Sequence, residues 1–338
     1  MARKLEKTPA NGLIIGKFLP PHAGHLYLIK QAAKQVQRLT VMVCALNAEP
    51  ISGVLRLDWM RQLCPDATVI LNTDENPSYP EDHPDFWDIW RESIMSRLPQ
   101  APDVVFSGEA YGETLAQVLG ARHVCVDRVA GVVPISGSLI RQNPYQYWTF
   151  LPSPVRAYYA FRVGMLGAES TGKTTLAQAL ADALQTDWIQ EYGRIFVDEH
   201  GRLPVQEEMA FLAAEQLRLE DEAAARCNQV LIGDTTPHTT RLYSDYYFGS
   251  SSDALIAAVK RARYDLLILA EDDIPWVADG MQRDGAHVRA ALQPHFRKAV
   301  QESGFPWIAA RGNLSERLAF CMEEIRSRLN CPPKRENA

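Results

Sequence analysis

The sequence predicts an α/β fold with two doubly wound parallel-sheet domains, and three observations carry this prediction. The chain has 338 residues, which is more than one hydrophobic core usually serves. In both halves, short apolar runs typical of buried strands alternate with amphipathic helical patterns, as in parallel sheets covered on both faces. Residues 142–155 contain three prolines, which we expect to interrupt helical structure. We therefore place a boundary near 150–160 and predict domains at 11–150 and 160–330.

Composition and charge exclude several classes of protein. The chain is 46% apolar and 22% charged, which is ordinary for a globular protein, and its net charge of −6 argues against a broad nucleic-acid-binding face. No apolar run reaches membrane-spanning length, and the first residues lack the apolar core of a signal peptide. The six cysteines form no C-x-x-C pair, which favours buried thiols in a reducing cytoplasm over disulfides or a zinc site.

Apolar periodicity predicts the elements of the first half. Strands are expected at Asn11–Phe18, Thr40–Leu46, Ala67–Asn72, Asp103–Ser107 and His123–Val129. Helices are expected at His25–Leu39, Arg56–Leu63, Phe86–Leu98 and Tyr111–Leu119. In such a sheet a ligand binds at the carboxyl ends of the strands, near a switch in strand order.

The turn after the first strand carries an unusual set of residues. His22 and His25 lie three residues apart at the start of the next helix, in a run that also contains Gly16 and Gly24. The glycines allow close backbone approach, and imidazole N–H groups at a helix N-terminus suit a phosphate group in transit. The pattern therefore favours a nucleotide-handling site over ordinary surface or core histidines.

Residues 16–25 resemble the nucleotidyltransferase signature, in the GxFxPxHxGH form of the nicotinamide mononucleotide adenylyltransferases. Residues 135–141 (ISGSLIR) resemble that family's second element, ISxTxxR, with a serine in the place of the commoner threonine. The resemblance implies that the phosphate of nicotinamide mononucleotide attacks the α-phosphorus of ATP, giving NAD and pyrophosphate without a covalent protein intermediate. It implies that Mg²⁺ and the following side chains stabilise the transition state: His22, His25, Lys17 and Arg141. It also implies ATP contacts by Gly16, Phe18, Gly24, Ser136 and Ser138.

Two further segments of the first half are candidates for ligand contacts. Trp87 and Trp90 share a helix face, so they either pack in the core or offer a flat surface to a pyridinium ring, for which we favour Trp87. Gly108 follows a strand and opens a helix, which suits a contact with ATP, although a simple capped helix start has the same pattern.

The second half begins with a phosphate-binding loop. Residues 167–174 (GAESTGKT) match G-x-x-x-x-G-K-[ST], between a predicted strand at 162–166 and a helical pattern at 175–184. Lys173 would neutralise charge on the β- and γ-phosphates, and the Thr174 hydroxyl would hold Mg²⁺. The predicted ATP contacts are Gly167, Glu169, Ser170, Thr171, Gly172, Lys173, Thr174 and Thr175.

Carboxylates follow two strands of this half. Glu191 ends a strand near 187–190, where small-molecule kinases place the general base, although a cap or salt bridge is the alternative. Asp234 ends a buried strand at 229–233, which is the Walker-B-like place for a Mg²⁺ ligand. No glutamate follows Asp234 and there is no N-K-x-D motif, so a kinase is favoured over a motor or a GTPase. The remaining predicted elements are a helix at Val205–Cys227, strands at Tyr264–Glu271 and Pro306–Ala310, and a helix at Leu314–Leu329.

The polar and aromatic run 235–249 suits a riboside, and residues 272–283 are predicted to form a lid with Arg283 as its arginine and Arg289 as the rival. Together with the phosphate-binding loop, these segments resemble the ribosylnicotinamide kinase half of the NadR proteins, and the first half resembles their adenylyltransferase half. The resemblance covers residues 11–330. It implies substrate contacts by Tyr192, Arg194, Thr239, Tyr243, Trp276 and Asp279. Some members begin with a helix-turn-helix domain, and the ten residues before the first expected strand are too few for one, so we expect no DNA-binding regulation by this chain.

The resemblance implies a cytoplasmic, bifunctional enzyme of NAD salvage. Its small molecules would be ATP, nicotinamide riboside, nicotinamide mononucleotide and NAD, with Mg²⁺ as the metal and without nucleic-acid or membrane partners; homo-oligomerisation is left open. One alternative is a nucleotidyltransferase–kinase fusion that acts on another riboside or on a pantetheine-like substrate. The other is a nucleotide-sensing regulator with little turnover, which the intact Lys173, Thr174, His22 and His25 disfavour.

Overall fold

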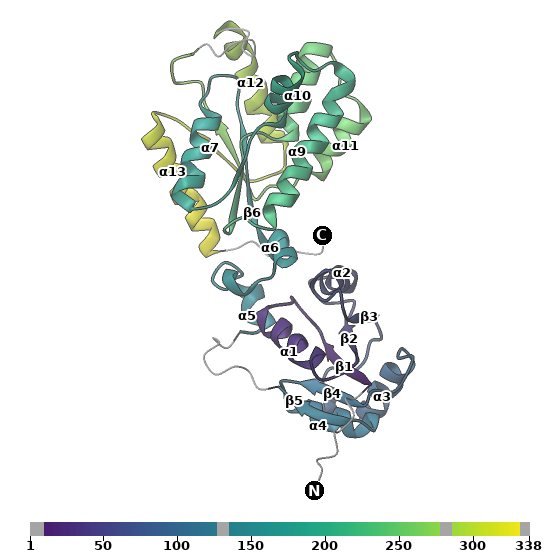
Figure 1. Cartoon of the computed structure of the whole chain (residues 1–338). Coiled ribbons are helices and arrows are strands. Elements are labelled where there is room, and N and C mark those ends of the chain that lie inside the picture. The colour runs from purple at the N-terminus through teal and green to yellow at the C-terminus, as the bar shows by residue number, and fades with distance from the viewer. Residues whose placement is uncertain (1–9, 127–134, 278–285, 332–338) are drawn as a thin grey trace. The chain divides into compact units, whose positions relative to one another are not determined.

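The computed structural model describes residues 10–126, 135–277 and 286–331, and the chain forms two compact units that divide between Val155 and Arg156 (Figure 1). Each unit is built on its own five-stranded parallel sheet, with strand orders β3-β2-β1-β4-β5 and β10-β9-β6-β8-β7. In both sheets the first strand of the unit is central, and later strands lie on both sides of it. This arrangement is typical of a doubly wound sheet. The predicted fold class is confirmed.

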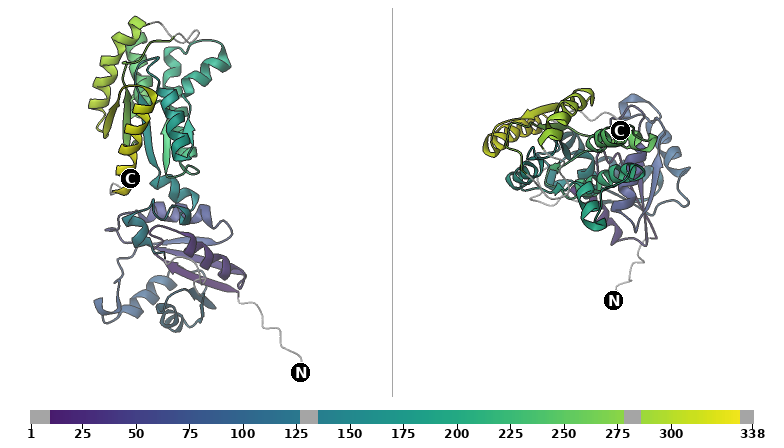
Figure 2. Two further views of the ribbon diagram at one scale, coloured as in Figure 1. Left: turned by 90° about the vertical axis from the view of Figure 1, so that its left-hand side faces the viewer. Right: turned by 90° about the horizontal axis from the view of Figure 1, so that it is seen from above.

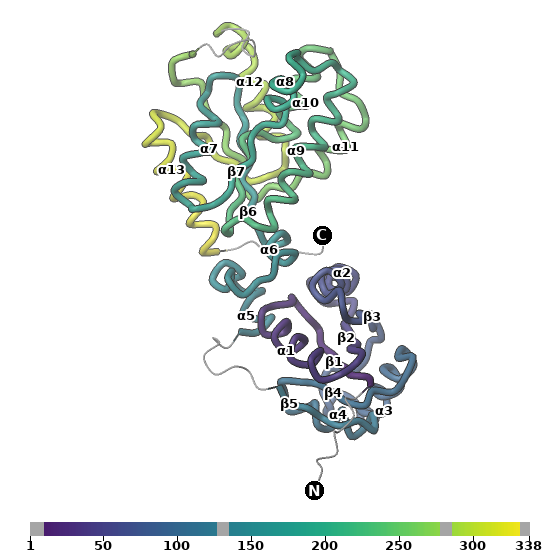
Figure 3. The backbone as a smooth tube through the Cα atoms, viewed as in Figure 1, coloured from purple at the N-terminus to yellow at the C-terminus, as the bar shows by residue number. Residues whose placement is uncertain are grey.

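The first unit alternates strands and helices along the chain, which the tube trace follows (Figure 3). Its strands are β1 (Asn11–Gly16), β2 (Arg38–Cys44), β3 (Thr68–Asn72), β4 (Val104–Ser107) and β5 (Arg122–Cys125). Its helices are α1 (Ala23–Ala33), α2 (Gly53–Leu63), α3 (Phe86–Met95), α4 (Tyr111–Leu119) and α5 (Gly137–Gln142).

The two faces of the first sheet are covered by different helices because neighbouring side chains of a strand point to opposite faces. Ile14 of β1 packs with Ile29 of α1 and Met60 of α2. The preceding residue, Leu13, packs on the other face with Ile94 of α3 and Leu115 of α4. The carboxyl end of β1, where the motif of residues 16–25 begins, therefore lies at the switch point between the two layers.

The second unit repeats this plan with longer helices. Its strands are β6 (Phe161–Leu166), β7 (Trp188–Ile189), β8 (Val230–Gly233), β9 (Leu266–Ala270) and β10 (Trp307–Ala310). Its longer helices are α7 (Lys173–Leu184), α8 (Tyr192–His200), α9 (Met209–Ala224), α10 (Pro237–Phe248), α11 (Asp253–Arg261), α12 (Ala286–Glu302) and α13 (Leu314–Asn330). The short helix α6 (Ser153–Tyr159) leads into β6.

One face of the second sheet carries a large hydrophobic core. Leu267 and Leu269 of β9 pack with Leu217 of α9, Leu255 of α11 and Phe296 of α12. Helices α7 and α13 pack against each other on the opposite side, as Figures 1 and 2 show. The phosphate-binding loop connects β6, the central strand, to α7.

Several predicted boundaries were wrong, and packing explains them. The helix expected to reach Leu39 ends at Ala33, because Arg38 and Leu39 pair with β1 as part of β2. The strand expected to reach Phe18 ends at Gly16, and the helix expected to reach Leu98 ends at Met95. The helix expected at Val205–Cys227 is α9 preceded by a short 3₁₀ turn.

The proline-rich segment separates α5, which ends at Gln142, from the next α-helix, as expected, but that helix begins inside the segment. This helix, α6, has Pro154 in its first turn, where a missing N–H costs no helical hydrogen bond. Residues 127–129 of the last strand predicted for the first half lie outside the described residues.

No helix within the described ranges is long and apolar enough to cross a membrane. Cys44, Cys64, Cys227 and Cys321 are buried, and burial raises the pKa of each of these thiols.

Candidate active sites

The turn between β1 and α1 brings the two predicted histidines into direct contact. His22 caps α1, its Nδ1 accepts the Gly24 backbone N–H at 3.2 Å, and the His25 Nδ1 accepts the His22 N–H at 3.3 Å. Their rings stack at a centroid distance of 3.8 Å. Because both Nδ1 atoms accept, the proton of each neutral ring is on Nε2. The pair is therefore a set of N–H donors at a helix N-terminus, which suits a phosphate oxygen.

A buried ion cluster, not foreseen from the sequence, holds the same turn. Arg56 of α2 is fully buried and donates to the Lys17 carbonyl at 2.7 Å. Glu49 pairs with Arg56 at 2.6 Å and with Lys17 Nζ at 3.0 Å. Burial raises the pKa of Glu49, but the Leu46 N–H and the two cations outweigh it and lower that pKa overall. Lys17 is thus anchored beside the histidines, with its side chain 53% exposed.

Helix α5 carries the second predicted element onto this turn. Ser136 caps α5 by accepting the Leu139 N–H at 3.3 Å, and Arg141 donates to the Leu19 carbonyl and to Ser138 Oγ. A Cβ placed on Gly137 would lie 2.3 Å from the Leu19 carbonyl oxygen. Only glycine therefore allows α5 to approach so closely, and the structure unites motifs that are more than 100 residues apart in the sequence.

The remaining predicted residues of the first unit have mixed positions. Phe18 is 1% exposed in the core, so only its backbone could contact ATP. Trp87 packs half-buried against the α3–α4 core, edge-on to Phe86. Gly108 follows β4, and close to it the Tyr111 hydroxyl donates to the Ile15 carbonyl at 3.2 Å, so this loop lies beside the end of β1.

The phosphate-binding loop of the second unit has the backbone that its glycines predict. Gly167 has φ 142° and Gly172 has φ 80°, and a Cβ on Gly167 would lie 2.6 Å from the Ala270 carbonyl oxygen. Lys173 opens α7, and its Nζ donates to the carbonyls of Gly167 (2.9 Å) and Ala168 (3.0 Å). The ammonium group therefore lies within the curve of the loop.

Beneath the start of α7, Thr174 and Asp234 form a candidate metal site. The Thr174 hydroxyl donates to Asp234 Oδ2 at 2.7 Å. The other oxygen, Oδ1, is buried and has no hydrogen-bond partner among the described residues. Burial raises the pKa of Asp234, and Lys173 and Thr174 oppose that rise. A hydroxyl and a carboxylate with an unpaired oxygen form the donor set that a hard divalent cation requires, so these residues fit Mg²⁺.

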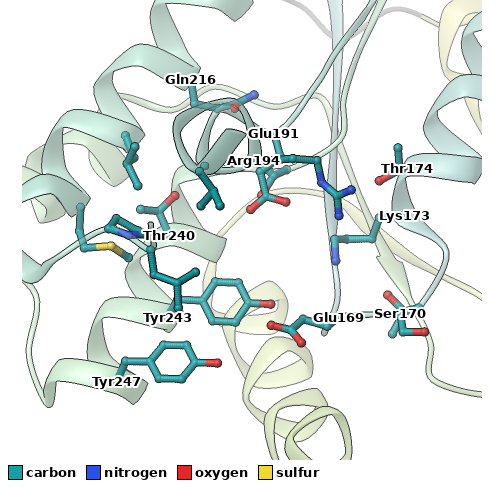
Figure 4. Close-up of a pocket in the computed structure, with 18 of the residues that line it drawn as sticks. Glu169, Ser170, Lys173, Thr174, Glu191, Arg194, Gln216, Thr240, Tyr243 and Tyr247 are labelled. Carbon is teal, nitrogen blue, oxygen red and sulfur yellow. The ribbon is translucent and has the colours of Figure 1, made fainter. Parts of the chain in front are cut away.

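A cavity of about 500 Å³ opens in front of the phosphate-binding loop (Figure 4). Glu169, Ser170 and Lys173 lie along one side of it, with Glu191 and Arg194 above and Tyr243 opposite (Figure 4). Burial raises the pKa of Glu191, against the lowering effect of Lys173. One wall is apolar and includes Phe248, from the run 235–249 predicted to suit a riboside. Its other residues were not foreseen, because they look like ordinary core in the sequence: Val197, Leu203, Pro204, Met209 and Leu212.

Some of the residues predicted for the second site do not line the cavity. Thr239 is 2% exposed inside α10, and its neighbour Thr240 faces the cavity instead. Tyr192 packs its ring against Phe211 at 5.9 Å. Trp276 is half-buried, and its Nε1 has no hydrogen-bond partner in the described part of the chain. Asp279 and Arg283 lie outside the described residues.

The rival lid arginine, Arg289, is already engaged by the backbone. It donates to the carbonyls of Ser170 (3.3 Å) and Ile274 (2.9 Å). Thr235 and Tyr247, which belong to the run 235–249 predicted to suit a riboside, also line the cavity. Gln216 lines it as well, and the sequence did not indicate that residue.

The folds and the two sites define a protein that joins a nucleotidyltransferase-like unit to a P-loop unit. Consistently, the model of the cytidylyltransferase-like family matches residues 13–143, and that of the AAA domain matches residues 162–317. The chain is 30% identical to the trifunctional NAD biosynthesis/regulator protein NadR of Escherichia coli (strain K12), over 93% of this chain and 82% of that protein. The protein of the same name from Salmonella typhimurium (strain LT2) matches with the same identity and coverage. The chain belongs to the NadR family.

Two solved structures share the fold. A NadR protein in complex with NR superimposes with a TM-score of 0.78 at 18% identity, covering 95% of this chain and 96% of that chain. A NadR protein in complex with NAD and AMP-PNP gives a TM-score of 0.76 with the same identity and coverage.

Proposed function

We propose that the chain is a bifunctional enzyme of NAD salvage. The domain at residues 160–330 transfers the γ-phosphoryl group of ATP to the hydroxyl of nicotinamide riboside, which gives nicotinamide mononucleotide. The domain at 11–150 transfers the adenylyl group of a second ATP to that product, which gives NAD and pyrophosphate. The observation that carries the proposal is that this NadR-family chain contains two nucleotide-binding arrangements, the His22–His25 pair and the Lys173–Thr174–Asp234 cluster.

In the kinase site, the phosphate-binding loop and the residues at the strand ends have different roles. The loop N–H groups and Lys173 hold the phosphates, while Thr174 and Asp234 would hold Mg²⁺. When bound, the metal ion neutralises charge that develops on the phosphates. Glu191 lines the same cavity and its pKa is raised by burial, so it is a stronger base for the riboside hydroxyl than an exposed carboxylate. Arg194 supplies a second cation to the same space.

The acceptor riboside would occupy the remainder of the cavity. Its volume of about 500 Å³ and its apolar wall beside Tyr243 suit a flat heterocycle joined to a sugar. The proposal keeps Arg283 as the lid arginine and Asp279 and Trp276 as substrate contacts. It assigns no substrate contact to Tyr192 or Thr239, because neither residue lines the cavity.

In the adenylyltransferase site, catalysis rests on position and charge. The His22 and His25 Nε2–H groups and the N-terminus of α1 would stabilise the negative oxygens of the α-phosphate. Lys17 and Arg141 add positive charge. The other predicted contacts are at the ends of nearby elements: Gly16 ends β1, Gly24 is in the first turn of α1, Ser136 and Ser138 are at the start of α5, and Gly108 follows β4. A phosphate monoester is already a nucleophile, so no strong base is required. Trp87 as the surface for the nicotinamide ring is part of this proposal.

The experiment supplies the purified protein with ATP, Mg²⁺ and nicotinamide riboside and follows both nucleotides by chromatography. Nicotinamide mononucleotide should form first and NAD should follow. If neither product forms, the proposal fails, and a regulator that binds nucleotides with little turnover takes its place. A cytoplasmic location is part of the proposal, in keeping with the buried thiols.

A further inference from the structure

Two buried glutamines hydrogen-bond the backbone of segments at the kinase cavity, and one of them, Gln216, itself lines the cavity. Gln216 lies on α9 and Gln293 lies on α12, and each is 2% exposed. A glutamine side chain buried this completely needs partners for both ends of its amide. In both cases one partner is a loop of the proposed active site, and the other is a buried glutamate.

Gln216 holds the loop that carries the proposed base. Its Oε1 accepts the backbone N–H of Tyr192 at 2.9 Å, and its Nε2 donates to Glu220 Oε1 at 3.4 Å. Tyr192 is the first residue of α8, where backbone N–H groups have no partner within the helix. Glu191, the residue before this bond, and Arg194, two residues after it, face the cavity.

Gln293 holds the phosphate-binding loop in the same way. Its Oε1 accepts the Ala168 N–H at 3.0 Å, and its Nε2 donates to Glu271 Oε2 at 3.1 Å and to the Ala270 carbonyl at 3.0 Å. Glu271 is fixed in turn by Arg297 at 2.6 Å and Arg311 at 3.2 Å. Ala168 lies between the strand β6 and the residues that would contact phosphate.

The glutamates explain why each amide points in one direction. An ionised carboxylate only accepts hydrogen bonds, so the NH₂ end of each glutamine must face it and the oxygen must face the loop. The Tyr264 hydroxyl donates to the carboxylate of Glu220, at 3.0 and 3.1 Å from its two oxygens, and this hydrogen bond favours the ionised form that accepts. Each glutamate therefore fixes the glutamine amide so that its Oε1 accepts the backbone N–H of Tyr192 or Ala168.

We infer that Gln216 and Gln293 are positioning residues for the two arms of the kinase site. Gln216 positions the segment of Glu191, the acceptor arm, through the Tyr192 N–H. Gln293 positions the phosphate-binding loop, the ATP arm, through the Ala168 N–H. The inference rests on the proposed kinase function. It predicts that Gln216 affects the binding of the riboside and that Gln293 affects the binding of ATP.

The test compares Gln216→Met and Gln293→Met in the full-length protein at about pH 8, where Glu220 is ionised. Methionine keeps the volume and removes the acceptor. Gln216→Met should raise the KM for the riboside about tenfold and leave the KM for ATP unchanged. Gln293→Met should raise the KM for ATP about tenfold and leave that for the riboside unchanged.

Each variant is the other's matched control, since both lose one buried amide. A loss of folding alone would reduce the amount of active enzyme and lower kcat without moving either KM. Equal effects on both substrates, an unchanged pair of KM values, or the reverse assignment would overturn the inference. If a methionine variant does not fold, as judged by its thermal unfolding, Gln216→Asn and Gln293→Asn replace it, because the shorter amide stays polar but leaves the loop N–H unreached. A wild-type protein without kinase activity would refute the proposed function instead.

Discussion

At the scale of single residues, the second unit keeps several carboxylates in buried positions where their charge is costly. Asp234 is 3% exposed with one oxygen unpaired in the described structure, and Glu220 is 1% exposed. A buried charge persists when function or a hydrogen-bond network requires it. The two residues illustrate the two cases, since Asp234 faces the start of α7 and Glu220 lies behind the cavity.

Asp234→Asn should lower the kinase kcat by about 100-fold or more, because a neutral amide holds Mg²⁺ poorly. The measurement is the rate of nicotinamide mononucleotide formation as a function of Mg²⁺ concentration, and the half-saturating concentration should also rise. Asp187→Asn is the control, since Asp187 pairs with Arg226 on the surface. An unchanged Mg²⁺ dependence in Asp234→Asn would remove Asp234 from the metal site.

Glu220→Gln should change the pH dependence of stability. Burial raises the pKa of Glu220 to about 7 from 4.5, and Arg162 opposes that rise. Because the folded state binds the proton more tightly than the unfolded state, stability from this group is present below pH 4.5 and is lost as pH rises through about 7. The rise corresponds to about 3 kcal/mol of unfolding free energy. The variant should lack this loss. In urea unfolding at about pH 5 and pH 8, the free energy of unfolding of the variant relative to the wild type should therefore be higher at pH 8 than at pH 5. Parallel curves would contradict the prediction.

At the scale of elements, the sequence predicted which segments are helices and strands better than where they end. The helix after His25 was expected to continue to Leu39, since Val36 keeps the apolar spacing of a helix. In the structure Val36 and Leu39 reach the same core from a turn and from β2. A helix and a neighbouring strand can bury the same apolar residues, and only the pairing of Arg38 with Asn11 decides between them.

Gly137→Ala tests the contact between α5 and the turn after β1. The added Cβ would meet the Leu19 carbonyl at 2.3 Å, so α5 must move and carry Arg141 and Ser136 with it. We expect NAD formation from supplied nicotinamide mononucleotide to fall about tenfold or more, with an increased KM for ATP, and kinase activity to be unchanged. Gly120→Ala is the control: its φ of 68° strains the variant by about 1 kcal/mol, but no atom lies within 4 Å of the new Cβ. An active Gly137→Ala protein would show that α5 need not lie so close.

At the scale of the whole molecule, the chain carries two units that each have a complete sheet and core. The proposed product of the second unit is the proposed substrate of the first. Separate cores imply that a change in one site leaves the other folded.

His22→Ala should stop NAD formation while nicotinamide mononucleotide accumulates, because the phosphate oxygens lose a donor at the helix N-terminus. Lys173→Ala should stop phosphorylation of the riboside and leave NAD formation intact when mononucleotide is supplied. Chromatography of both nucleotides separates the two results. Loss of both activities in either variant, with its thermal unfolding unchanged, would contradict the two-site assignment.

The sequence by itself determined the two doubly wound sheets and the nucleotide motifs at the ends of their first strands, because periodicity and short motifs involve residues close together in the chain. The tertiary structure alone decided that Arg141 reaches Leu19, that Arg56 is buried beneath Lys17, and that Thr240 lines the cavity in place of Thr239. It also joined Gln216 to the Tyr192 backbone and Gln293 to the Ala168 backbone at the kinase site. Such contacts join residues as many as 125 positions apart. They depend on how whole helices pack on a sheet, which no local pattern of side chains encodes.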